Sequence, residues 1–161
     1  MRFTDKVAIV TGAGNGIGLS IAYAFAAEGA QVVVADINVA SGAKAVAEIE
    51  AAGGRAISVP VDVADEGQVE NLVQIVLARL GRVDILVNNA GVVLHRLLVE
   101  TERADWDRQL AVQLTGPFLT SKHVARHMLA RVGYGKIVSQ GFEAMVVCES
   151  CSIVPQLGLG G

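Results

Sequence analysis

The sequence has few of the features that mark secreted, nucleic-acid-binding or membrane-spanning proteins. It contains only two cysteines, too few for a secreted disulfide framework, so a reducing, cytoplasmic location is expected. Its 16 acidic and 13 basic residues form no long run of either sign, and we expect neither nucleic acid nor an anionic membrane as a partner. No apolar stretch approaches the roughly 20 residues of a membrane span, and the N-terminus runs into a predicted strand instead of a signal sequence.

Aromatic residues are also scarce, at 4% of a chain that is 52% hydrophobic. Ala, Val, Leu and Ile supply most of the apolar content, which is typical of strands buried on both faces and covered by Ala-rich helices. A chain of 161 residues has room for one well-buried core and is too short for two ordinary domains. The composition therefore favours a single α/β domain.

Short β-branched runs alternate with longer segments of helical spacing. The runs lie at residues 7–10, 32–35, 57–61 and 85–87, and a fifth is expected near 136–138. Strands that alternate with crossover helices form a parallel sheet, because parallel neighbours need a long connection. The pattern predicts a Rossmann-type, doubly wound parallel sheet. Pro60 fits the third strand because proline lacks a ladder donor and that strand lies at the edge in the order 3-2-1-4-5-6.

Each predicted helix has a readable end. The first is expected to stop at Glu28-Gly29, the second to span about 40–52, and the third to begin at Asp65 and end at Gly81. A longer helix is predicted over 102–131, with a kink at Gly116-Pro117. Apolar spacing in the first helix predicts a buried face made of Ile17, Ile21, Ala24 and Phe25.

A glycine-rich loop joins the first predicted strand to the first helix, with the spacing G-x-x-x-G-x-G. Gly12 suits the tight turn, Gly16 admits phosphates to the amides at the helix start, and Gly18 allows close helix packing. Such loops are common, and a purely structural turn is the alternative for the motif taken alone.

Asp36 strengthens the cofactor interpretation. It ends the second strand about twenty residues past the loop, where a carboxylate accepts hydrogen bonds from the adenosine ribose hydroxyls. The same carboxylate repels a 2′-phosphate, and no cation lies in the loop or directly after Asp36 to hold one. The sequence favours NAD over NADP. The alternative is that Asp36 only caps the following turn.

Together, Thr11-Gly12-x-x-x-Gly16-Ile17-Gly18, Asp62-Val63 and Asn88-Asn89-Ala90-Gly91 resemble the short-chain dehydrogenase/reductase family, from about Lys6 to Val138. The resemblance implies NAD-dependent hydride transfer between an alcohol and a ketone. It also implies that Asp62 and Val63 contact adenine and that the Asn-Asn-Ala-Gly stretch supports the sheet and lines the cofactor ribose. The predicted cofactor-binding residues are Gly12, Asn15, Gly16, Ile17, Gly18, Asp36, Asp62, Val63, Asn89, Ala90 and Gly91.

The catalytic residues that the resemblance implies are not found. Gln113 stands where the family helix has Asn, and Phe142 stands at the expected Ser. Neither Tyr23 nor Tyr134 is followed four residues later by Lys, and a substitute pair of Tyr134 with Lys136 is disfavoured by its spacing. We therefore predict no catalytic residue in this chain.

Other reactive residues are read as incidental. His123 and His127 have helical i, i+4 spacing but no third ligand, so solvated helix histidines are expected and no metal site is predicted. Cys148 and Cys151 lack a second pair and are interpreted as incidental thiols.

After Val138 the sequence shows no sustained helical or strand periodicity. We therefore predict a NAD-binding domain over 1–138 and a divergent, unassigned tail over 139–161. One interpretation is a truncated or frame-shifted oxidoreductase, which would take a small alcohol or ketone only in a longer form. A second is a non-catalytic NAD-binding half-domain that associates with full-length relatives, or forms homo-oligomers, through the 102–131 helix. A third is a product that does not fold stably, because a sheet that stops at the fifth strand leaves an edge unpaired.

Overall fold

Five short apolar runs form the strands of one parallel sheet in the computed structural model, which describes residues 1–93, 97–131 and 135–140. The strand order is β3-β2-β1-β4-β5, and every neighbouring pair is parallel. The Rossmann-type fold and its strand order are therefore as predicted. The strands are β1 Val7–Thr11, β2 Gln31–Asp36, β3 Arg55–Pro60, β4 Ile85–Asn88 and β5 Lys136–Ser139.

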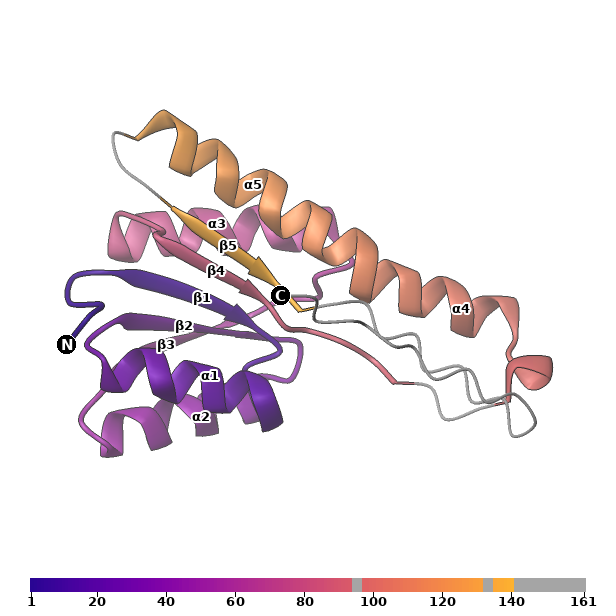
Figure 1. The fold of residues 1–161 in the computed structure, drawn as a ribbon, viewed down its shortest axis with the longest axis horizontal. Coiled ribbons are helices and arrows are strands. Elements are labelled where there is room, and N and C mark those ends of the chain that lie inside the picture. The colour runs from indigo at the N-terminus through magenta and orange to yellow at the C-terminus, as the bar shows by residue number, and fades with distance from the viewer. Residues whose placement is uncertain (94–96, 132–134, 141–161) are drawn as a thin grey trace, which may run out of the picture.

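Helices cover both faces of the sheet (Figure 1). Alternate residues of β1 point to opposite faces, so Val7 and Ile9 join the core under α3 and α5, while Ala8 and Val10 join the core under α1 and α2. This two-sided burial explains the continuous apolar runs of the inner strands. The helical elements, in chain order, are α1 Gly16–Ala27, α2 Val39–Ala51, α3 Glu66–Leu80, the 3₁₀ turn η1 Leu98–Glu100, α4 Arg103–Leu110, the π-helical segment η2 Ala111–Thr115 and α5 Gly116–Ala130.

The third helix begins and ends where the sequence predicts. The Asp65 carboxylate accepts the backbone N–H of Gln68 at 3.0 Å and so caps α3. Gly81 adopts φ 72°, the left-handed conformation that closes a helix. Pro60 is the last residue of β3, and β3 lies at the sheet edge as expected.

The prediction for the buried face of α1 was wrong for Ile17 and Ala24, whereas Ile21 and Phe25 are partly buried against the core. Ile17 is 67% exposed and Ala24 is also exposed, whereas Gly18, Ala22 and Ala26 are buried. At Gly18 a side chain would collide with Gly12 O in the loop that precedes α1, so glycine is needed at this point of the buried face. The larger Ile17 is left at the rim of a pocket.

The long helix has its irregularity one turn earlier than expected. The N–H of Gly116 bonds to Ala111 O, five residues back, and η2 connects α4 to α5 as one continuous rod (Figure 1). Pro117 lies in the first turn of α5, where the absence of its N–H is tolerated. The π-helical segment thus takes up the disturbance that we expected as a kink at Pro117.

Candidate functional site

A pocket of about 400 Å³ lies at the carboxyl ends of β1, β2 and β4. Every residue of the predicted cofactor set except Gly16 lines it. It is called here the carboxyl-end pocket, and a neighbouring pocket of about 500 Å³ shares Ile17 and the stretch from Asn89 to Val92 with it. Lining residues that were not predicted are Ala35, Ile37, Asn38, Val61, Val92, Arg108 and Val112.

The loop after β1 is held in place from β4. Asn89 Nδ2 donates to Thr11 O at 3.0 Å and to Gly12 O at 3.2 Å. The Thr11 hydroxyl accepts the N–H groups of Asn89 and Ala90, both at 3.0 Å. A Cβ added to Gly18 would collide with Gly12 O and with the Asn89 amide. Gly18 and Asn89 therefore set the shape of the loop itself.

The amino end of α1 opens toward this pocket. Asn15 is its N-cap but makes no side-chain capping bond, and the first turn holds no acidic residue. The first-turn amides have no partner within the helix, which makes a helix start of this kind attractive to an anion. Asn15, Ile17 and Gly18 from this turn line the pocket.

Asp36 is buried, with 9% of its surface exposed, at the end of β2. One carboxylate oxygen accepts the Gly14 N–H at 2.8 Å, and the other accepts the Asn38 N–H at 2.9 Å. A Cβ on Gly14 would approach Asp36 Oδ2 to 2.8 Å, so glycine is required there. Gly14 was missed as a functional residue, although its place in the loop was the available signal.

Asp62 lies on the loop after β3, the strand that pairs with β2, and lines the same pocket. Its Oδ1 accepts the Ala64 N–H at 3.0 Å, and its own N–H donates to Gln68 Oε1 at 2.9 Å. Arg108 Nη1 on α4 lies 3.5 Å from Asp62 Oδ2. No motif in the sequence signalled Arg108, because α4 comes from far along the chain.

Asn88 ties the middle of the sheet to its last strand and to α5. Its Nδ2 donates to Ser121 Oγ at 3.2 Å and to Ser139 Oγ at 3.1 Å, and its Oδ1 accepts the Thr120 hydroxyl at 2.7 Å. The buried amide is thus satisfied on both sides. Ser139 ends β5, one residue past the predicted end.

Two positions that bear on catalysis, Gln113 and Tyr23, lie within the described residues. Gln113 donates its side-chain amide to Val92 O and lines the neighbouring pocket. Tyr23 lies on α1 and donates to Glu48 at 3.2 Å, and partial burial together with Glu48 raises the pKa of its phenol. Tyr134 and Phe142 lie outside the described residues.

The expectation of solvated histidines was wrong for His123. Its ring is buried, and its Nε2 lies 3.1 Å from Glu66 Oε1, because α5 packs against the start of α3. Within the described ranges, no group of three His, Cys, Asp or Glu residues is placed to hold a metal. No helix in the same ranges has the length and apolar character to cross a membrane. Cys148 and Cys151 lie outside the described part of the chain.

Comparison with known proteins gives a consistent result. The sequence model of the short chain dehydrogenase family matches residues 6–144, past the expected limit at Val138. A crystal structure of a protein described as a short-chain dehydrogenase/reductase from Burkholderia xenovorans superposes with a TM-score of 0.81 at 43% identity, covering 86% of this chain and 56% of that one.

Two curated relatives show the same partial overlap. An uncharacterized oxidoreductase of Thermotoga maritima is 41% identical over 91% of this chain and 57% of its own length. The galactitol 2-dehydrogenase of Agrobacterium fabrum is 40% identical over 89% of this chain and 55% of its own. The chain thus spans about half the length of the curated relatives it matches. With its fold, its loop and its matched sequence in agreement, this chain belongs to the short-chain dehydrogenase family.

Proposed function

We propose that this chain binds NAD in the carboxyl-end pocket. Members of its family are oxidoreductases that use a nicotinamide cofactor, NAD or NADP. The choice of NAD rests on Asp36, whose partners in the described chain are backbone amides and not cations. A carboxylate in this setting accepts hydrogen bonds from ribose hydroxyls and repels a 2′-phosphate.

The remaining predicted residues have matching roles in this proposal. The pyrophosphate is placed at the open start of α1, beside Asn15, Gly16 and Ile17, where backbone amides favour an anion. Asp62 and Val63 are placed against the adenine, and Asn89, Ala90 and Gly91 against the nicotinamide ribose. Support comes from the pocket, which brings these separate segments to one place.

We further propose that this polypeptide does not catalyse hydride transfer by itself. Reduction of a carbonyl needs a proton donor near the substrate oxygen, and the sequence contains no Tyr-x-x-x-Lys pair. The side-chain amide of Gln113 also donates its hydrogen bond to Val92 O. Alcohol or ketone turnover is expected only of a longer form. The cytoplasmic location of the protein stays a prediction.

Calorimetric titration of the purified chain with NAD tests the binding proposal. A cooperative thermal transition is recorded first, so that a negative result refers to folded protein. We expect saturable binding to one site. Absence of binding to the folded chain would remove the proposal, and alcohol-dependent NADH production by the chain would refute the prediction of no turnover.

The long helix supports a proposal about partners. Three large apolar side chains on η2 and α5 are strongly exposed, Leu114 at 60%, Phe118 at 62% and Leu129 at 86%. Exposed apolar residues along one rod are typical of helices that associate. We propose that copies of the chain, or longer relatives, pair through this helix. Sedimentation of the wild-type chain and of Phe118→Gln tests it, and an unchanged monomeric mass for both would contradict it.

A further inference from the structure

Arg108 is the only cation among the residues that line the carboxyl-end pocket. The same lining contains two carboxylates, Asp36 and Asp62. A dinucleotide brings further negative charge to the pocket with its pyrophosphate. Arg108 therefore supplies the positive charge that offsets one of these two carboxylates, Asp62, at a distance of 3.5 Å.

Only one of the two members of the Arg108–Asp62 pair is fixed by other contacts. The backbone on both sides of Asp62 is held by the bonds of its N–H to Gln68 and of its Oδ1 to the Ala64 N–H. The Arg108 side chain is 52% exposed and reaches Asp62 Oδ2 from α4 at 3.5 Å. The flexible arginine thus meets a carboxylate whose other oxygen is already oriented.

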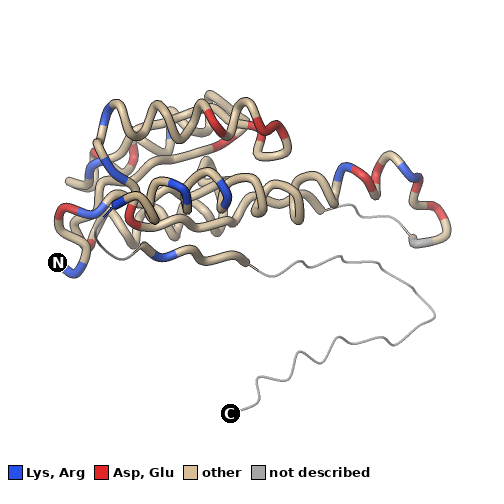
Figure 2. The backbone as a smooth tube through the Cα atoms, turned by 90° about the horizontal axis from the view of Figure 1, so that it is seen from above, with Lys and Arg blue, Asp and Glu red and all other residues tan. Residues whose placement is uncertain are grey.

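The helix that carries Arg108 has little else to hold it over the pocket. In the described chain, α4 packs chiefly against η2, its own continuation. Basic and acidic residues follow one another along α4 (Figure 2), and Arg103 is engaged with Asp107 on the same helix at 2.7 Å. Arg108 instead crosses to the loop after β3 and bridges two walls of the pocket.

We propose that Arg108 is a cofactor-positioning residue that acts through Asp62. The two side chains form a clasp across the adenosine end of the carboxyl-end pocket, in which Asp62, already fixed by its own loop, holds Arg108 and so keeps α4 against the bound ligand. This inference rests on the proposed NAD site and adds a residue to it. Its contribution is electrostatic, so it weakens as salt screens the pair.

Titration of four full-length proteins with ADP-ribose, a probe of the adenosine end, tests the clasp. Arg108→Met keeps the length of the side chain and removes its charge, and we expect about fivefold weaker binding, the upper end for a partly exposed ion pair. Arg108→Lys should recover most of the loss. Arg103→Met, on the same helix but outside the pocket, is the matched control and should bind as wild type does.

A double-mutant cycle separates positioning from simple support of the fold. In an Asp62→Asn background, Arg108→Met should change ADP-ribose affinity by less than about twofold, because its partner is already gone. Equal affinity of wild type and Arg108→Met would overturn the clasp while leaving the NAD site intact. A full loss of about fivefold in the Asp62→Asn background would also overturn it. No binding of ADP-ribose by folded wild type would instead refute the proposed function, and the clasp with it.

Discussion

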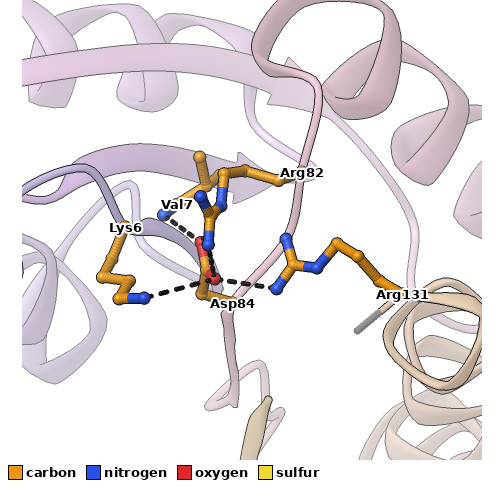
Figure 3. Close-up of polar contacts among 5 residues, drawn as sticks. All are labelled: Lys6, Val7, Arg82, Asp84 and Arg131. Carbon is orange, nitrogen blue, oxygen red and sulfur yellow. Dashed lines mark hydrogen bonds and ion pairs between the residues drawn. The ribbon is translucent and has the colours of Figure 1, made fainter. Parts of the chain in front are cut away.

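Two buried aspartates at opposite ends of the sheet show how differently the same side chain is used. Asp84, before β4 at the amino end, is 3% exposed and is surrounded by donors of its own chain (Figure 3). Arg82 Nη2 lies 2.6 Å from it, Arg131 Nη2 lies 2.9 Å away, and the Val7 N–H donates at 3.0 Å. Burial opposes ionisation, but these bonds outweigh it and hold the pKa of Asp84 at about 2.

Asp36, at the carboxyl end, has only backbone partners in the described chain and lies beside a pocket. The Asp36 carboxylate has acceptor positions left for a ligand. The Asp84 carboxylate instead accepts hydrogen bonds from three segments of the chain, at Val7, Arg82 and Arg131. The contrast fits a structural role for Asp84 and the proposed ligand-binding role for Asp36. Four predictions test this difference between Asp84 and Asp36.

The largest effect is expected from Asp84→Asn. The change leaves Arg82 and Arg131 without their buried counter-charge, and we expect the free energy of unfolding to fall by about 3 kcal/mol. Urea denaturation measures it, and the NAD affinity of the protein that remains folded should not change. A loss below about 1 kcal/mol would show that Asp84 is not the link between these segments.

Asp36→Asn should give the opposite result. Removing the charge weakens NAD binding by about 2 kcal/mol, or about thirtyfold, because hydrogen bonds from ribose hydroxyls to a carboxylate are lost. The free energy of unfolding in urea should fall by only about 1 kcal/mol, less than for Asp84→Asn, since the amide oxygen still accepts one of the two backbone N–H groups. Calorimetry with NAD and NADP checks it, and a variant that binds NAD as well as wild type would contradict the role of Asp36.

Acid should act mainly through Asp84. Its pKa is lowered to about 2 in the folded protein from 3.8, so its stabilising contribution is complete above the unfolded value and is lost as pH falls toward about 2. The shift corresponds to about 2 kcal/mol. Denaturation of wild type and Asp84→Asn between neutral pH and pH 2 measures it, and parallel curves for the two proteins would disagree with this assignment.

Lys6→Met should have the smallest effect. Lys6 Nζ lies 3.9 Å from Asp84 Oδ1 and its side chain is 45% exposed, so the pair contributes only about 0.5 kcal/mol. Thermal unfolding measures the loss of stability of Lys6→Met relative to wild type, and the same measurement on Arg82→Met provides the comparison. A loss as large as that of Arg82→Met would mean that total charge, and not close hydrogen bonding, stabilises Asp84.

The fold and the pocket could be predicted because their signals are local. Apolar runs, and helix ends such as Asp65 and Gly81, are recognisable from a few consecutive residues. The loop from Gly12 to Gly18, together with Asp36, forms a motif with regular spacing. The Asp84 cluster was not predictable in this way, since Lys6 and Arg131 lie far from Asp84 in the sequence. Arg108 was missed for the same reason.

The errors have a different physical origin. Apolar spacing predicted that Ile17 would be buried, yet close contact of α1 with its loop requires Gly18 on the buried face, and Ile17 lies at the rim. His123 was expected to be solvated because its partner, Glu66, lies on another helix. The assignment of a divergent tail from residue 139 stays a prediction.

The ratio of NADP to NAD dissociation constants of the wild-type chain tests the contrast most directly. Because Asp36 lines the pocket and is held by backbone amides in the described chain, its charge is available to repel a 2′-phosphate, and NADP should bind at least about tenfold more weakly than NAD. Equal or tighter binding of NADP by the folded chain would contradict the role of Asp36 as the reader of the adenosine ribose.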